Sequence, residues 1–174
     1  MKIQYRKMKK EKHIEYYPNG QKKEAGHYLD GKKDGLWTRW SEYGRKENEG
    51  IYKEGELIKI TAWDFYTGVK TKEIHFNGLD NKGRPILDGK LTIWHRDGQQ
   101  KAAVTNYKDG KPDGLIIQWY TNGQKWSEVT VRGDDKPEGL GTTWYENGQK
   151  KQEQIYKDGE LTSEKNWDED GNEI

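Results

Sequence analysis

The sequence predicts an all-β fold, an elongated single-layer antiparallel meander of consecutive β-hairpin repeats. Three observations predict it: a Trp-x-x-x-Gly unit recurs along the chain, strand-forming residues alternate before each unit, and a turn-forming glycine ends each unit. Self-similarity at a period of about 20 to 50 residues is typical of repeat architectures. The anchor glycines of this unit are Gly20, Gly44, Gly68, Gly98, Gly123, Gly148 and Gly171.

Each repeat opens with a predicted strand that ends at the aromatic residue of the unit. Counted back from the anchor glycine, positions −8, −6 and −4 carry mainly Leu, Thr and Trp, as in Leu36, Thr38 and Trp40. Steps of two residues are the period of a strand, and both Trp and Thr are strand formers. We therefore expect these three positions to share one face and to form the core side of the sheet.

A turn and a returning strand complete each predicted hairpin. Asn or Asp precedes the glycine in five of the seven units, as in Asn19-Gly20, and such pairs favour type I′ turns. The returning strand carries Lys and Glu, which we expect to pair on a solvated face, and ends on an aromatic or apolar residue such as Tyr28. A second turn, such as Asp30-Gly31, closes the repeat.

These repeats define one predicted domain over residues 14–174, with about six repeats and a C-terminal half-repeat. Residues 1–13 are expected to form an N-terminal cap or an edge strand, since terminal repeats are commonly atypical. The third repeat is irregular and carries an insertion over residues 78–85. That insertion is interpreted as either a kink or a functional loop.

The composition indicates an ordered but thin structure. Hydrophobic residues make up 30% of the chain and charged residues 35%, so little apolar area is available to offset chain entropy. Eight Trp and eleven Tyr at fixed register supply large contact areas instead. A formal net charge of +1 gives no general attraction for nucleic acid or anionic lipid. We therefore expect neither a nucleic-acid partner nor a membrane partner.

The location expected from the sequence is the cytoplasm. The chain contains no cysteine, which excludes disulfides and is compatible with a reducing compartment. Its basic first residues are not followed by the apolar segment of a secretory signal. No apolar run approaches the roughly 18 residues that a membrane-spanning helix requires.

No catalytic, cofactor-binding or metal site is predicted, and we expect the protein not to be an enzyme. The four histidines, at positions 13, 27, 75 and 95, lack the spacing of metal ligands. The acidic segment 168–173 coincides with a predicted turn and lacks the terminal bidentate Glu of a calcium loop. The glycine-rich stretches lack the Gly-Lys-Ser/Thr ending of a phosphate loop.

The repeat resembles the bacterial variant of the MORN-type repeat, in which Tyr or Trp is followed by x-x-Asn-Gly-x-x-Lys. The resemblance is carried by segments such as Tyr16–Lys23, Trp119–Lys125 and Trp144–Lys151, and it extends over about residues 14–174. Chains made only of this variant are similar to the YwqK-type antitoxin family, whose members are thought to neutralise a toxin encoded beside them. The resemblance implies a MORN-like solenoid and transfers no catalytic residue.

The predicted second face of the opening strand is the candidate surface for a partner. Positions −7, −5 and −3 are mixed, with more apolar content than a solvated face requires, so this face is either covered by the curvature of the sheet or docks a partner. Aromatic residues that break the consensus of their positions are added to the same set. The candidate partner-binding residues are Trp37, Arg39, Phe65, Tyr66, Ile93, His95, Gln118, Tyr120, Trp126 and Tyr145.

Two functions remain open from the sequence. The first is an antitoxin or immunity protein that binds and blocks a protein toxin, its cognate effector, with a monomer as the favoured state. The second is a structural or adhesive repeat scaffold, associated with the cell surface. A toxic neighbouring gene product would favour the first, and a surface-bound pool of the protein would favour the second.

Overall fold

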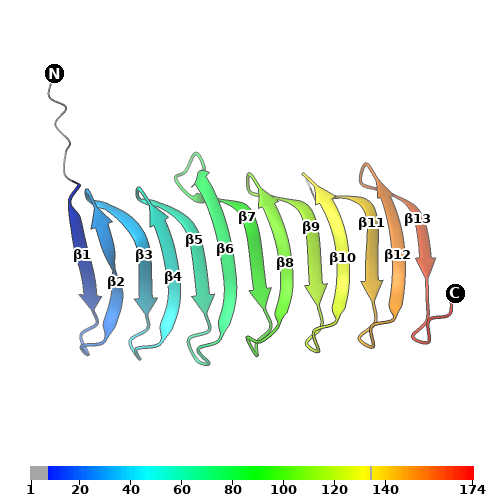
Figure 1. The fold of residues 1–174 in the computed structure, drawn as a ribbon, viewed down its shortest axis with the longest axis horizontal. Helices are drawn as coiled ribbons and strands as arrows, with labels where there is room; N and C mark the ends of the chain where they lie inside the picture. The colour runs from blue at the N-terminus through cyan, green and yellow to red at the C-terminus, as the bar shows by residue number, and fades with distance from the viewer. Residues whose placement is uncertain (1–7, 134) are drawn as a thin grey trace, which may run out of the picture.

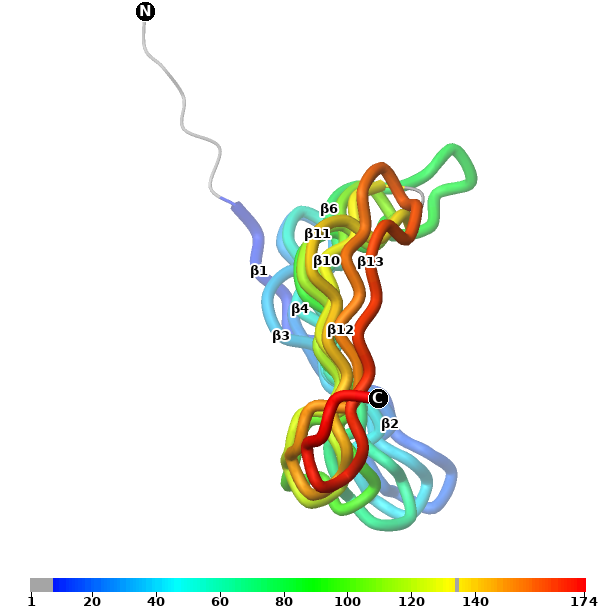
Figure 2. The backbone as a smooth tube through the Cα atoms, turned by 90° about the vertical axis from the view of Figure 1, so that its right-hand side faces the viewer, coloured from blue at the N-terminus to red at the C-terminus, as the bar shows by residue number. Residues whose placement is uncertain are grey.

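A computed structural model of the chain describes residues 8–133 and 135–174, and these residues form one open sheet. Its 13 strands lie in sequence order, each antiparallel to the next, and no helix occurs in the described residues. The strands stand side by side along one long axis in a single layer (Figures 1 and 2). The predicted all-β meander of hairpins is confirmed. The strands are β1 (Lys10–Tyr16), β2 (Lys22–Leu29), β3 (Lys32–Trp40), β4 (Lys46–Lys53), β5 (Glu56–Trp63), β6 (Lys70–Leu79), β7 (Pro85–Trp94), β8 (Lys101–Lys108), β9 (Lys111–Trp119), β10 (Lys125–Arg132), β11 (Lys136–Trp144), β12 (Lys150–Lys157) and β13 (Glu160–Asn166).

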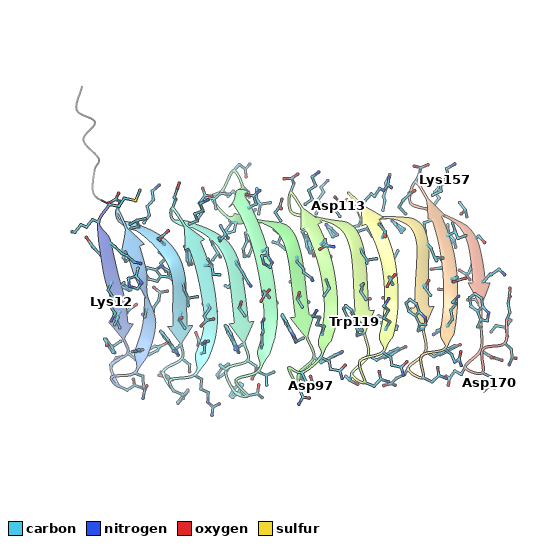
Figure 3. All side chains as sticks on the ribbon, viewed as in Figure 1. Lys12, Asp97, Asp113, Trp119, Lys157 and Asp170 are labelled. Atoms are coloured by element: carbon cyan, nitrogen blue, oxygen red, sulfur yellow. The ribbon has the colours of Figure 1, made fainter. Side chains whose placement is uncertain are left out.

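Two kinds of turn alternate on the two long rims of the sheet. The anchor-turn rim contains the turns with the anchor glycines and the strand residues next to them, and Asp97 and Asp170 mark it in Figure 3. The short-turn rim contains the turns between β2 and β3, β4 and β5, and so on, and Asp113 and Lys157 lie towards it (Figure 3). Each repeat therefore contributes one turn to each rim.

The anchor turns are not the type I′ turns that the Asn-Gly pairs predict. In the first turn the amide of Gly20 donates to the carbonyl of Tyr17 at 2.9 Å, and the amide of Tyr17 donates to the carbonyl of Gln21 at 2.8 Å. Only Gly20 has positive φ there, at 83°. This is the three-residue loop in which a turn is followed by a left-handed glycine. Asn19 instead uses its side chain, since its Oδ1 accepts from the amide of Gln21 at 3.0 Å.

The paired positive φ angles occur on the short-turn rim. Asp30 and Gly31 have φ of 48° and 78°, and Asp109 and Gly110 have φ of 50° and 82°. Two-residue loops of this kind match the right-handed twist of the flanking strands. The sequence pattern therefore predicts a turn type that occurs in this sheet, but it places that turn on the anchor-turn rim instead of the short-turn rim.

One face of the sheet carries alternating threonine and carboxylate side chains across the strands. We call it the threonine face, and its cross-strand column is Ala25, Thr38, Glu49, Thr61, Glu73, Thr92, Val104, Ile117, Glu128, Thr142, Glu153 and Lys165. Lysines beside the anchor turns reach both this column and the next Trp. The Nζ of Lys70, for example, lies 2.9 Å from a carboxylate oxygen of Glu73 and 4.2 Å from the ring centroid of Trp94. The cation–π contacts link consecutive repeats, whereas these ion pairs lie within one strand.

The expectation that the Leu, Thr and Trp positions form the core side is wrong for leucine. Leu36 and Leu140 are 53% and 55% exposed, although Thr38 on the same face is buried. A single-layer sheet has no second layer to cover it, so a side chain is buried only by its lateral neighbours. Leu36 and Leu140 lie close to the short-turn rim, lack large neighbouring side chains and remain exposed to solvent.

The most buried large side chain, Trp37, lies on the opposite face, which we call the tyrosine face because Tyr28, Tyr52, Tyr107 and Tyr156 lie on it. Trp37 is 2% exposed. Its ring centroid lies 5.2 Å from that of His13, 4.9 Å from that of Tyr28 and 6.3 Å from that of Tyr52. The largest part of the core is therefore a local cluster of rings between the first repeats, and Val104 and Val131 are buried separately further along the sheet.

The insertion at residues 78–85 forms the end of a longer hairpin. β6 and β7 are ten residues each, and their turn closes through the amide of Asp80, which donates to the carbonyl of Arg84 at 2.8 Å. This hairpin projects beyond its neighbours on the short-turn rim (Figure 1), and the sheet continues through it without a break. At the N-terminus, β1 is an edge strand, and residues 1–7 of the predicted cap lie outside the described residues.

Candidate partner-binding rim

Tyrosine hydroxyls at position −3 connect neighbouring repeats along the anchor-turn rim. The hydroxyl of Tyr17 donates to the carbonyl of Trp40 at 2.9 Å. Tyr120 and Tyr145 make the same bond, also at 2.9 Å, to the carbonyls of Trp144 and Trp167. The position that follows each Trp therefore holds the next repeat in register.

His95 occupies the same position in the fourth repeat and makes an equivalent contact. Its Nε2 lies 3.0 Å from the carbonyl of Trp119, which makes this nitrogen the donor. Imidazole and phenol thus serve the same role at this place in the array.

A second series of bonds joins the tips of the anchor turns. The Nδ2 of Asn19 donates to the carbonyl of Glu42 at 2.8 Å, and Asn122 donates to the carbonyl of Glu146 at the same distance. Because the Oδ1 of each Asn already accepts an amide in its own turn, one side chain fixes two turns. The Asn before the glycine therefore uses both polar atoms of its side-chain amide, Oδ1 in its own turn and Nδ2 towards the next turn.

The junction between the second and third repeats departs from this pattern. Position −3 there is Ser41, which is buried and whose Oγ accepts from the amide of Arg45 at 3.3 Å. The connection to the next repeat comes from Arg45, whose Nη1 donates to the carbonyls of Phe65 and Tyr66, the first at 3.2 Å. A short side chain at position 41 therefore replaces the tyrosine found at this position in the first, fifth and sixth repeats.

The anchor turn of the third repeat is one residue longer, and Asp64 organises it. Its Oδ1 accepts from the amides of Tyr66 and Thr67 at 3.0 and 2.8 Å and from the hydroxyl of Thr67 at 3.0 Å. These bonds, that from the amide of Thr67 first, hold the pKa of the Asp64 carboxyl below its usual range. The longer turn presents Phe65 and Tyr66 outwards, with their ring centroids 3.7 Å apart.

Exposed aromatic side chains gather on the anchor-turn rim. Tyr43 and Tyr66 are 74% and 72% exposed. Among the described residues, the aromatic side chains classed as exposed are Tyr16, Tyr43, Phe65, Tyr66 and Trp126, and all five lie in an anchor turn or within two residues of one. Large exposed side chains on the two faces are aliphatic instead. This rim therefore concentrates the residue type most enriched at the centre of protein interfaces.

The candidate residues predicted from sequence fall into two groups. Phe65, Tyr66 and Trp126 are exposed on the anchor-turn rim, and Ile93 is half-exposed on the tyrosine face. The others are engaged within the chain: Trp37 in the ring cluster, Arg39 with Glu47 at 3.4 Å, Gln118 with Ser127 at 2.7 Å, and His95, Tyr120 and Tyr145 in the bonds between repeats. Their role with a partner stays a prediction.

Sequence reasoning missed Tyr43, the most exposed aromatic residue of the rim. The signal was present, because Tyr43 precedes Gly44 at the position where most units carry Asn or Asp. A tyrosine there cannot make the two-ended amide contact of Asn19. It is therefore free to face solvent.

A shallow groove lies beside Tyr43. It is lined by Tyr17, Ser41, Glu42, Tyr43, Glu47 and Phe65. Its lining residues comprise three aromatic residues, two carboxylates and Ser41. The groove therefore combines apolar walls with negative charge.

The described residues contain no group of three or more His, Cys, Asp or Glu side chains that could hold a metal ion. Nothing in residues 8–133 and 135–174 forms a helix long and apolar enough to cross a membrane.

Comparison with known families identifies the repeat. Residues 12–30 and 137–158 match the sequence model described as MORN repeat variant. The chain carries MORN-type repeats. The matched segments hold the β1–β2 and β11–β12 hairpins, with the turn residues Asn19 and Asn147 that bond to the next repeat. No curated protein matches the chain. MORN-type repeats indicate a repeat-based binding or scaffold module.

Proposed function

We propose that this chain is a non-catalytic protein-binding module that engages its partner along the anchor-turn rim. The observation that carries the proposal is the gathering of the five exposed aromatic side chains of the described residues on that one rim. Tyr and Trp are enriched among the few residues that carry most of the binding energy of protein interfaces. The bonds between repeats hold these rings on a rigid frame, so little conformational entropy is lost on binding.

The partner that we propose is a protein toxin encoded beside the gene for this chain, which the module neutralises by direct binding as a monomer in the cytoplasm. The similarity of its repeats to those of YwqK-type antitoxins supports this proposal. Immunity proteins of other folds block their toxins through surface complementarity alone and reach very high affinity.

A structural scaffold is the second candidate, and the open sheet favours it. The strands β1 and β13 both end the sheet with backbone groups available for pairing, and such edges promote lateral assembly. A scaffold of this kind would bind copies of itself or surface material. It would have no toxic neighbour.

Coexpression tests the proposal directly. The product of the adjacent gene is induced in a bacterial host with and without this chain, and growth is measured together with affinity capture of the complex. We expect rescue of growth and a stable complex. If the adjacent product is neither toxic nor captured, the antitoxin proposal is wrong.

A rim variant identifies the surface. Tyr43→Ser, Tyr66→Ser and Trp126→Ser combined remove three exposed rings from the anchor-turn rim. The matched control, Leu36→Ser with Leu140→Ser, removes two apolar side chains that are also exposed, from the threonine face. We expect the rim variant to lose capture and rescue while the control keeps both, with circular dichroism of both variants unchanged. Equal behaviour of the two variants would place the interface elsewhere.

A further inference from the structure

We propose that the groove at the junction of the second and third repeats binds an arginine side chain presented by the protein partner. This inference rests on the proposed function, because it names the chemistry that a protein partner brings to one point of the anchor-turn rim. The groove is formed where the array departs from its own repeat, which distinguishes it from the junction before it, where Tyr17 bonds to the carbonyl of Trp40.

The walls of the groove are aromatic. Tyr17 is fixed by its bond to the carbonyl of Trp40 at 2.9 Å, while Tyr43 and Phe65 come from the next two anchor turns. Ser41 forms the floor and is buried. Rings from three consecutive repeats thus surround a space that is open to solvent on the rim.

The charge of the lining selects a cation. Glu42 and Glu47 are the charged residues of the lining, and both are carboxylates. Glu47 has one cationic partner, Arg39, at 3.4 Å, and this contact is partly exposed. The guanidinium of Arg45 donates to the carbonyls of Phe65 and Tyr66 and does not line the groove. Glu42 has no ion pair among the described residues, so an incoming cation meets its carboxylate beside the aromatic rings of the lining.

Arginine fits this combination better than lysine does. A guanidinium is planar, stacks on aromatic faces and is weakly hydrated, whereas an ammonium is a compact and strongly hydrated charge. Its fork of donors also matches a carboxylate in a bidentate arrangement. The chain already uses cations over rings at this rim, since the Nζ of Lys46 lies 4.8 Å from the ring centroid of Trp63.

The sixth repeat provides a matched comparison on the same rim. Position −3 there is Tyr145, which fills the junction and bonds to the next repeat, and Asn147 stands at the position of Tyr43. Glu146 holds the same place in its turn as Glu42 does in the second repeat. The carboxylate is therefore present in both turns, but of these two turns only the one after Ser41 lines a groove together with Tyr17, Tyr43 and Phe65.

The test uses the full chain labelled with ¹⁵N and four probes: capped Gly-Gly-Arg-Gly-Gly, the same peptide with Lys or Glu in the centre, and choline. We expect millimolar Arg peptide to shift amide resonances of the turns around Tyr43 and Phe65. The Lys peptide should bind more weakly, and the Glu peptide should cause no shifts there. Stronger binding of choline than of the Arg peptide would overturn the assignment to arginine.

Variants locate the site. Glu42→Gln with Glu47→Gln should weaken Arg-peptide binding about fivefold, as expected for the loss of one exposed charge interaction of about 1 kcal/mol. Tyr43→Ala should abolish the shifts, Tyr43→Phe should keep them, and Glu146→Gln should leave the affinity unchanged. Equal effects of Glu42→Gln and Glu146→Gln, or shifts spread over the whole sheet, would overturn the proposal. A toxin complex that forms while the Arg peptide causes no shifts would overturn this inference alone and leave the proposed function standing.

Discussion

Replacing Gly26 with alanine should destabilise the first repeats by displacing the ring of Trp37. A Cβ at position 26 would lie 2.3 Å from Cδ2, 2.5 Å from Cε2 and 2.6 Å from Cγ of that ring. Ordinary contact requires the ring to move away by about 1 Å. The ring is held from other sides by His13 and Tyr28, and by Lys33, whose Nζ lies 3.9 Å from its centroid.

The expected magnitude follows from this confinement. Forcing extra volume into a closely packed site costs about 1–3 kcal/mol. Gly141→Ala is the matched control, because Gly141 is also buried in a strand but its Cβ would meet Tyr156 and Val129 at an ordinary 3.4 Å. That control should be neutral or stabilising by about 0.4–1 kcal/mol, since alanine lowers the entropy of the unfolded chain.

Urea denaturation followed by near-ultraviolet circular dichroism measures both effects. A double-mutant cycle with Trp37→Ala adds the decisive comparison. Trp37→Ala alone should cost about 3–5 kcal/mol, and Gly26→Ala should then cost almost nothing more, because the ring that it strikes is absent. If Gly26→Ala destabilises the Trp37→Ala background as much as the native chain, or matches Gly141→Ala, the reasoning is refuted.

Two further predictions concern the bonds between repeats. Tyr145→Phe removes the donor to the carbonyl of Trp167 and should lower the free energy of unfolding by about 0.5–1.5 kcal/mol. Tyr43→Phe changes an exposed ring and should leave the free energy of unfolding unchanged. Equal urea midpoints for the two variants would contradict a stabilising role of the Tyr145 hydroxyl. Burial would raise the pKa of Glu73, but hydrogen bonds and attraction from Lys70 and Lys59 outweigh burial and hold the pKa below its usual value of 4.5. The stabilisation by the Glu73 carboxylate is therefore complete above about pH 4.5 and is lost as the pH falls through the lowered pKa. The native chain should be more stable than Glu73→Gln by about 0.2–1 kcal/mol at pH 7, and this difference should shrink on acidification. A difference that is the same at pH 7 and pH 3 would contradict this prediction.

The sequence predicts the fold because the repeat pattern and the strand period agree at every unit. Turn geometry is less accessible, since Asn-Gly serves both a type I′ turn and a loop with one left-handed glycine. What decides between them at Asn19 is a bond to Glu42 in the next repeat, which no local pattern contains. The burial of Leu36 was predicted wrongly for a related reason: alternation assigns a face, but only neighbouring side chains decide whether that face is covered.

The candidate partner-binding residues also divide into those that are exposed as expected and those that are bonded within the chain. Phe65, Tyr66 and Trp126 break the consensus of their positions, and the structure places all three in solvent on one rim. Tyr120 and Tyr145 follow the consensus, and the structure shows them bonded to the repeat that follows. Departure from the repeat, rather than aromatic character, is thus the better guide to exposure in this chain.

On the anchor-turn rim, the bonds that Tyr, His, Arg and Asn side chains make between repeats run in one direction, from a side chain of one unit to a backbone carbonyl of the following unit. Asn122 reaches the carbonyl of Glu146, and Asn147 reaches the carbonyl of Glu169, so the receiving residue contributes only its main chain. Any unit that starts with such a carbonyl and ends with such an Asn can follow any other. In-frame duplication or deletion of a whole unit in the gene therefore creates a junction that is already satisfied, and the length of the array can change in evolution without new compensating substitutions.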